Sequence, residues 1–330
     1  MAHGHKPKAG SRAFWPRKRA KRIYPRVTSA SVPKLKGDVK PLNFAAYKAG
    51  MTTVIHEGNR KDAPTFGKDM ARPVTVLDCP PLFVCGAKLY GRNESDAVSL
   101  GMVFAEKLDK SLSRRISLPN KYDFKKKLAD AEKLLTEADD VKLVVSTQPA
   151  KGGIGKKTPE IFELTLSGEK DAKWAYAKEN LGKEIKVESV FEEGEFIDTT
   201  SVTTGYGMEG PVRRFGVKVR NRKAHNKRRH VGNIGAVTPS RVLPGKIAMA
   251  GQHGFQTRTE YNKRIFKIAS DGFEPSGGIL NYGSVPGQYV LLHGSVGGPK
   301  KRLIMLRKAM RRTGEKIPVE IKHVSKESQQ

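Results

Sequence analysis

The first 36 residues constrain the fold most, because they contain eleven lysines and arginines and no acidic residue. A segment of this composition cannot bury enough apolar surface to fold on its own. Phe14, Trp15 and Tyr24 are interleaved with the cations, and aromatic side chains stack on the bases of single-stranded RNA. We therefore predict a nucleic-acid-binding arm rather than a disordered solubilising tail. Its candidate RNA-binding residues are Arg12, Trp15, Arg17, Lys18, Arg19, Lys21 and Arg22.

The whole chain shares this bias. Its 62 lysines and arginines outnumber 33 aspartates and glutamates, which leaves a formal net charge of +29 over 330 residues. Such an excess needs a polyanion to neutralise it, so we expect nucleic acid as the partner. No apolar run reaches about 18 residues, and the N-terminal MAHGHKPKAGSR has no apolar signal region. We expect neither a membrane partner nor secretion.

A second basic segment lies between Tyr206 and Arg264, where glycine, proline and asparagine alternate with cations. Compact domains seldom contain a structureless stretch of this length unless it is functional or disordered. Glycine permits close approach to RNA, and arginine binds phosphate in two-point contacts. We predict a loop that is ordered by folded RNA, the alternative being a charged surface hairpin. Its candidate RNA-binding residues are Arg213, Arg214, Phe215, Lys218, Arg220, Arg222, Lys223, Lys227, Arg228 and Arg229.

The rest of the chain is typical of a mainly β protein with an α+β insertion. Strands are predicted in LNFAAYKAGMTTVIHEG, RPVTVLDCPPLFVCGAKLYG, EFIDTTSVTTG, RIFKIAS, GGILNYG, QYVLLHGSV and KRLIMLRKAM. Residues 123–138 instead place Phe124, Leu128, Ala131 and Leu135 on one helical face after an aspartate that can cap the helix. A strand in VKLVVSTQ and a helix around DAKWAYAKENLG follow, so residues 91–189 are predicted to form the insertion.

Residues suited to catalysis, metal binding or cofactor binding are scarce. Cys79 and Cys85 are six positions apart, which does not fit a zinc site, and we expect two reduced, buried thiols and no metal. The segment AKGGIGKKT departs from phosphate-loop spacing, so we interpret it as a solvated basic turn, with Lys156 and Lys157 available to phosphate. No nucleophile elbow or close carboxylate pair is present. We expect no catalytic residue, no cofactor and no small-molecule substrate.

Six blocks of sequence closely resemble the large-subunit ribosomal protein L-three family in its archaeal and eukaryotic form. They are FWPRKRA (14–20), GPVRRFGVK (210–218), VGNIGAVTPSRV (231–242), AGQHGFQTRTEYNKRI (250–265), GGILNYG (277–283) and LLHGSVGGPKKRLIMLR (291–307). They occur in order along nearly the whole chain. The insertion and the basic arm separate this chain from the shorter bacterial form, and an archaeal source is expected.

The resemblance implies a translation-protein type β-barrel from which the arm and the central loop extend through ribosomal RNA toward the peptidyl transferase centre. It places Gly232, Asn233, Gly235, Val237, Pro239 and Ser240 at or near the loop tip, and many relatives have tryptophan where this chain has Val237. It adds His225, Arg241, Gln252, Arg258, Lys263 and Arg264 to the RNA-binding candidates. The implied organisation is arm 1–37, barrel 38–90, insertion 91–189, barrel 190–205, RNA-penetrating loop 206–265, barrel 266–310 and basic tail 311–330.

The function expected from these observations is structural. The chain would bind ribosomal RNA and neighbouring large-subunit proteins in the cytoplasm, support subunit assembly and buttress the region of the peptidyl transferase centre. An architectural DNA-binding protein is the main alternative, although glycine-arginine loops suit folded RNA better than a regular groove. An RNA-modifying enzyme is a weaker alternative, because no catalytic constellation is found.

Overall fold

The chain divides into two compact units in the computed structural model, which describes residues 11–33, 35, 37–59, 63–93, 96–119, 122–238, 240–243, 245 and 247–328. The larger unit comprises residues 24–201 and 259–330, and the smaller unit comprises residues 1–23 and 202–258. The start of the predicted arm and most of the predicted basic loop therefore belong to one unit. Tyr24 belongs to the larger unit, where its hydroxyl donates a hydrogen bond to the Ile161 carbonyl at 2.8 Å.

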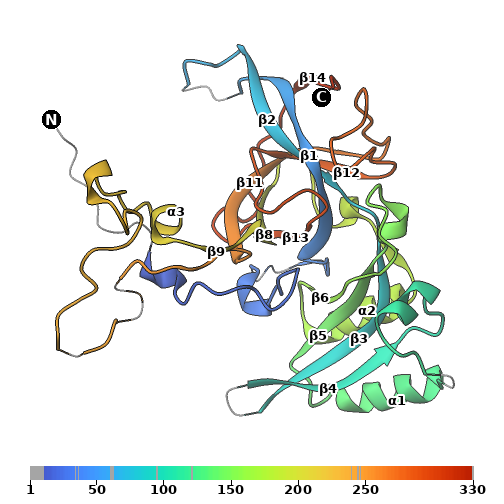
Figure 1. The fold of residues 1–330 in the computed structure, drawn as a ribbon. Coiled ribbons are helices and arrows are strands. Elements are labelled where there is room, and N and C mark those ends of the chain that lie inside the picture. Colours follow the sequence, from blue (N-terminus) through green and yellow to red (C-terminus); the bar gives the residue numbers. More distant parts are fainter. Residues whose placement is uncertain are drawn as a thin grey trace. The chain divides into compact units, whose positions relative to one another are not determined.

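A sheet of seven described strands runs through the larger unit (Figure 1). In spatial order the strands are β13 (Leu303–Lys308), β8 (Phe196–Val202), β11 (Thr257–Ala269), β12 (Tyr289–His293), β2 (Asp69–Asp78), β1 (Asn43–Glu57) and β14 (Ile321–Val324). One edge of the 15-residue strand β1 pairs with two different antiparallel strands. Asn43–Tyr47 pairs with β13, and Val54–His56 pairs with β14.

A second antiparallel sheet has five described strands, of which four lie within the predicted insertion 91–189 and one, Leu82–Asn93, lies mostly within the predicted barrel part 38–90. Its strands follow the order β4 (Asp96–Phe104), β3 (Leu82–Asn93), β5 (Asp140–Thr147) and β6 (Ile161–Thr165), and β7 (Glu184–Ile185) also pairs with β3. The helices α1 (Phe124–Leu134) and α2 (Lys170–Asn180) pack against this sheet. The Asp123 side chain accepts a hydrogen bond from the Lys126 backbone N–H at 3.1 Å, so the predicted cap is confirmed.

The two sheets share one hydrophobic core. It includes Phe44 of β1, Leu77 of β2, Val145 of β5, Trp174 of α2 and Leu306 of β13, all at most 3% exposed. Burial of this apolar surface stabilises the larger unit as a whole. Cys79 and Cys85 are free and buried, as the sequence predicted.

The mainly β class is confirmed, and the strands form antiparallel sheets. Because β13 pairs with β1 as well as with β8, the pairings join six of the seven described strands in a ring, whereas the translation-protein type of barrel stays a prediction from the resemblance. One predicted strand is wrong: GGILNYG forms a turn between isolated bridges. Gly277, Gly278, Asn281 and Gly283 have positive φ angles of 73°, 72°, 61° and 105°, which an extended strand does not accommodate.

The predicted loop between Tyr206 and Arg264 is also partly regular. β9 (Gly205–Glu209) and β10 (Gly251–Gly254) form a two-stranded ribbon, α3 (Pro211–Phe215) follows β9, and β11 begins at Thr257. Glycines at alternate positions of β9 and at both ends of β10 obscured these strands, because glycine is depleted in ordinary strands. Residues 216–250, between α3 and β10, contain the short 3-10 helix Arg222–Ala224 among their described residues.

Candidate nucleic-acid interface

The smaller unit has many cationic side chains and almost no acidic residue to balance their charge. Its two segments contain 20 of the 62 lysines and arginines but only one of the 33 acidic residues, Glu209. An oxygen of that glutamate lies 2.8 Å from the Arg213 guanidinium. The remaining cations of this unit have no carboxylate within the unit to neutralise them, which favours a polyanionic partner.

The buried Arg214 connects three segments of this unit. Its guanidinium donates hydrogen bonds to the carbonyls of Met249 (2.9 Å), Gln252 (3.0 Å) and Arg17 (3.2 Å), so it joins α3, the ribbon and the arm. Burial, and then the nearby Arg17 charge, lower the pKa of Arg214. A Cβ atom on Gly251 would lie 2.9 Å from this guanidinium, so the close approach requires glycine.

The aromatic candidates of the arm and the loop pack against each other. The rings of Trp15 and Phe215 stack at 5.5 Å with an angle of 4° between their planes, and the Arg17 guanidinium lies 4.6 Å from the Phe215 ring. Phe215 is only 2% exposed. The Ala20 backbone N–H donates to the Phe255 carbonyl at 2.8 Å, so a backbone bond also connects the arm to the residue after β10. Trp15 and Phe215 therefore form an internal aromatic contact in this structure.

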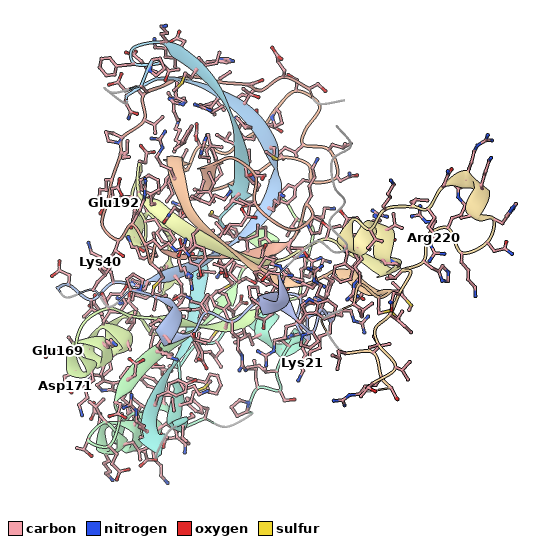
Figure 2. The ribbon with its side chains drawn as sticks, turned by 90° about the vertical axis from the view of Figure 1, so that its left-hand side faces the viewer. Lys21, Lys40, Glu169, Asp171, Glu192 and Arg220 are labelled. Carbon is pink, nitrogen blue, oxygen red and sulfur yellow. The ribbon has the colours of Figure 1, made fainter. Side chains whose placement is uncertain are left out.

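Most other candidates in the smaller unit present their side chains to solvent. The exposed candidates are Lys18, Arg19, Lys21, Arg22, Arg213, Lys218, Arg220, Arg222, Lys223, His225, Lys227, Arg228, Arg229 and Arg241. Arg220 extends from the segment that follows α3 (Figure 2). Trp15, Arg17, Gln252 and Arg258 are half-buried. The Arg12 side chain and Pro239 lie outside the described residues.

The expected loop tip contains two tight turns. The Asn233 side-chain oxygen accepts a hydrogen bond from the Gly235 backbone N–H at 2.8 Å, and Gly235 has a φ angle of 130°. The Ser240 hydroxyl donates to the Val237 carbonyl at 2.8 Å. Gly232, Asn233, Gly235 and Ser240 are exposed, and Val237 is 87% exposed, so an apolar side chain projects from the tip.

The ribbon adds surface residues that the sequence analysis did not select. Tyr206 stacks on His253 at 5.2 Å and is half exposed, the Arg213 guanidinium lies 4.7 Å from its ring, and Met208 is 80% exposed. Exposed aromatic rings beside cations suit base stacking. The alternation of large side chains with glycine in Gly-Tyr-Gly-Met-Glu was the available signal for a ribbon with one exposed face.

Two candidates belong to the larger unit. Lys263 lies 2.9 Å from Glu260 and donates to the Ser295 carbonyl at 2.7 Å. The Arg264 guanidinium lies 4.8 Å from the Phe266 ring, on which His293 stacks at 5.2 Å. The sequence placed both cations at the end of the basic loop, whereas they lie within β11.

The phosphate-loop-like segment has a structural role. The Gly153 backbone N–H donates to the buried carboxylate of Asp78 at 2.9 Å, and a Cβ atom on Gly152 would lie 2.7 Å from the same carboxylate. Burial raises the pKa of Asp78. Lys156 forms an ion pair with Glu160. These glycines therefore permit close packing on Asp78, and Lys156 has an internal partner.

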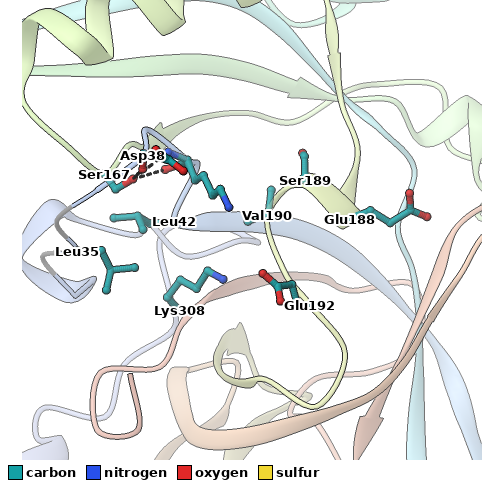
Figure 3. Close-up of a pocket in the computed structure, with 10 residues that line it drawn as sticks. Leu35, Asp38, Leu42, Ser167, Glu188, Ser189, Val190, Glu192 and Lys308 are labelled. Atoms are coloured by element: carbon teal, nitrogen blue, oxygen red, sulfur yellow. Dashed lines mark hydrogen bonds between the residues drawn. The ribbon is translucent and has the colours of Figure 1, made fainter. Parts of the chain in front are cut away.

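A cavity of about 280 Å³ in the larger unit differs from the basic surface of the smaller unit because charges of both signs line it (Figure 3). Lys308 on its wall lies 2.7 Å from Glu195, and Glu192 pairs with Lys316. Among the described residues, no group of three or more His, Cys, Asp or Glu side chains is arranged to hold a metal ion. No helix in the described part of the chain is both long and apolar enough to cross a membrane.

Charge, exposed cations and aromatic surfaces make the smaller unit typical of an RNA-binding protein. The family model described as Ribosomal protein L3 matches residues 1–330. The chain therefore belongs to the ribosomal protein L3 family, as its sequence motifs predicted.

Curated relatives agree with this assignment. The chain is 43% identical over 335 residues to large ribosomal subunit protein uL3 of Methanococcus aeolicus, covering 99% of the chain and 98% of the relative. It is 44% identical over 333 residues to that of Methanocaldococcus jannaschii, with the same coverage, and 40% identical over 342 residues to that of Methanobrevibacter smithii, covering 100% and 99%. The expected archaeal form and the expectation of a structural protein rather than an enzyme are confirmed.

Proposed function

We propose that the chain is a structural constituent of the large ribosomal subunit in the cytoplasm and binds ribosomal RNA through its smaller unit. Membership of the ribosomal protein L3 family supports the first part of this proposal. The observation that carries the second part is the ratio of 20 lysines and arginines to one acidic residue in that unit. Such a surface binds a polyanion by displacing its condensed counterions.

The candidate residues divide into two roles under this proposal. The exposed cations of the arm and of residues 216–250 contact phosphates directly. The buried Arg214 and Phe215, together with Trp15, instead hold the arm against the ribbon and so set the direction in which the contacts point. Lys263 and Arg264 provide a separate contact from the larger unit, next to His293.

We propose further that residues 232–240 reach toward the peptidyl transferase centre and buttress it without supplying chemistry. The resemblance to the family supports this placement, and the tight turn at Gly235 and the exposed Val237 suit close packing against RNA. Neighbouring large-subunit proteins are the other partners we propose. The mixed charge of the larger unit, 42 lysines and arginines with 32 acidic residues, suits such contacts better than it suits RNA.

Co-sedimentation tests this function directly. Large subunits are purified from cells that express the tagged chain, washed at high salt and centrifuged through sucrose. The chain should remain with the large subunit and be absent from the small subunit, because a constituent enclosed by folded RNA is retained even where high salt weakens its phosphate contacts. Release at moderate salt, or equal recovery with both subunits, would contradict the proposal.

A further inference from the structure

A groove of about 630 Å³ lies in the smaller unit between the arm and the ribbon. Its lining consists of Arg19, Ala20, Lys21, Arg22, Ile23, Gly205, Gly207, Gln252 and Phe255. The hydrogen bond from the Ala20 N–H to the Phe255 carbonyl joins the two walls. The groove is therefore built by segments that are far apart in the sequence.

The charges of this groove lack an internal counterpart. Arg19, Lys21 and Arg22 are exposed, and none of them forms an ion pair with a carboxylate among the described residues. The lining contains no acidic residue, and Glu209, the one acidic residue of the unit, already pairs with Arg213. The groove is therefore complementary to an anion.

The shape and the remaining lining restrict what the anion can be. Gly207 has open space on the side where a Cβ atom would be, so a ligand can approach the ribbon backbone closely. Phe255 and Ile23 add apolar surface, and Ile23 is 51% exposed. A groove of this volume accommodates a ligand of the size of a nucleotide.

We propose that this groove binds a single RNA nucleotide that is turned out of its helix. The cations hold the phosphates on either side of it, and the base and ribose pack against Phe255 and Ile23. RNA is recognised in this way at loops and bulges, where unstacked bases are free to enter protein pockets. This inference rests on the proposed binding of ribosomal RNA and adds the class of RNA element and the place where it binds.

The test fills the groove without changing its charge. Ala20→Leu adds three carbon atoms to the groove wall and keeps the backbone N–H that bonds to Phe255. Ala13→Leu makes the same change at an exposed position of the arm outside the groove and is the matched control. The full-length chain and both variants are titrated with fluorescent single-stranded hexauridylate, and unlabelled duplex RNA of the same length is the competitor.

The single-stranded probe should bind Ala20→Leu about tenfold more weakly than the unaltered chain, and Ala13→Leu within twofold of it, since loss of one stacked base and its phosphate contact is of this order. A hexamer containing 4-thiouridine should cross-link to residues 19–23 or to Phe255 in the unaltered chain, and this product should disappear in Ala20→Leu. Unchanged hexauridylate binding or cross-linking by Ala20→Leu, or equally effective competition by the duplex, would overturn the proposal.

The same titrations separate this inference from the proposed function. If Ala20→Leu and the unaltered chain bind hexauridylate equally while both bind large-subunit ribosomal RNA tightly, the groove assignment fails and the proposed function stands. If the unaltered chain binds ribosomal RNA no more tightly than duplex DNA at the same salt concentration, the proposed function fails, and the groove assignment fails with it. Amide exchange of residues 205–216 in Ala20→Leu shows whether the unit is still folded.

Discussion

The two units of the chain differ in how many acidic residues balance their lysines and arginines. The larger unit contains the other 42 lysines and arginines and 32 acidic residues, and many of these form ion pairs, such as Arg307 with Asp198 at 3.2 Å and Lys173 with Asp140 at 2.7 Å. The smaller unit has one carboxylate for 20 cations. The larger unit therefore neutralises most of its own positive charge, whereas the excess of 20 cations over one carboxylate in the smaller unit favours a polyanionic partner.

The units also differ in what is buried. The larger unit buries a core shared by two sheets. The smaller unit buries Phe215 and Arg214 of α3, and its described residues from Gly232 to Thr238 are all exposed. We therefore predict that the contacts among Trp15, Arg214 and Phe215 are stable in the free protein, and that the exposed segment between α3 and β10 becomes rigid only on binding.

The largest expected effect tests whether the smaller unit has a core of its own. Phe215→Ala removes a buried ring and should lower the local stability of this unit by about 3 to 5 kcal/mol. Amide exchange of residues 249–256 should accelerate strongly, whereas exchange of β5 and β12 stays unchanged. Phe14→Ala, which removes a ring that is 52% exposed on the same arm, is the control and should have little effect. Equal acceleration in β12 would show that the two units unfold together.

A smaller effect is expected from charge. Replacing Arg220, Arg222 and Lys223 with glutamine should weaken binding to ribosomal RNA by roughly a hundredfold at low salt and reduce the salt slope by about 0.7 to 0.9 per lost contact. The matched triple variant Lys125→Gln, Lys126→Gln, Lys127→Gln removes three exposed cations from α1 of the larger unit. It should change affinity only a few-fold. Filter binding across a potassium chloride series measures both, and identical slopes would remove the distinction between the units.

The next effect separates position from charge within the smaller unit. Gly235 has a φ angle of 130°, so Gly235→Val strains the turn by about 1 to 3 kcal/mol without changing net charge. Lys227→Gln removes one exposed cation among several. Gly235→Val should impair subunit maturation or peptide-bond formation more than Lys227→Gln does, and the melting temperature of the larger unit should not change. Sucrose gradients and a peptidyl transfer assay give the comparison. Equal, salt-sensitive defects would mean that the loop acts only as an electrostatic tether.

The smallest effect concerns pH and the larger unit. Burial and then the charges of Arg264, Arg72 and Lys263 lower the pKa of His293 below its ordinary value of 6.5. The unfolded chain therefore binds this proton more readily than the folded one, so the free energy of unfolding should fall as the pH decreases below 6.5. His293→Gln should flatten this dependence only slightly in thermal melts at pH 7.5 and 5.5, because the His293 side chain is exposed and solvent screens the neighbouring charges. A variant with the same pH dependence as the unaltered chain would exclude His293 as the cause.

The local sequence was sufficient for much of the fold. Asp123 and the apolar face of residues 124–135 predicted α1 and its cap, and the β-branched runs predicted β1, β2 and β5, because these signals depend on neighbouring residues. The charge of the arm and loop is likewise a property of composition. Turns that depend on positive φ angles, as in GGILNYG, were the exception, since a short apolar run between glycines resembles a strand.

Long-range contacts decided the arrangement of the candidate interface. Trp15 and Phe215 were both predicted to stack on RNA, yet they stack on each other across 200 positions of sequence, and Arg214 bonds to three carbonyls instead of to phosphate. No local pattern reveals such a contact, because burial depends on which distant segments meet. The groove between the arm and the ribbon has the same origin. The sequence alone predicted a polyanionic partner, and the tertiary structure decided which cations and rings are exposed and which pack inside the protein.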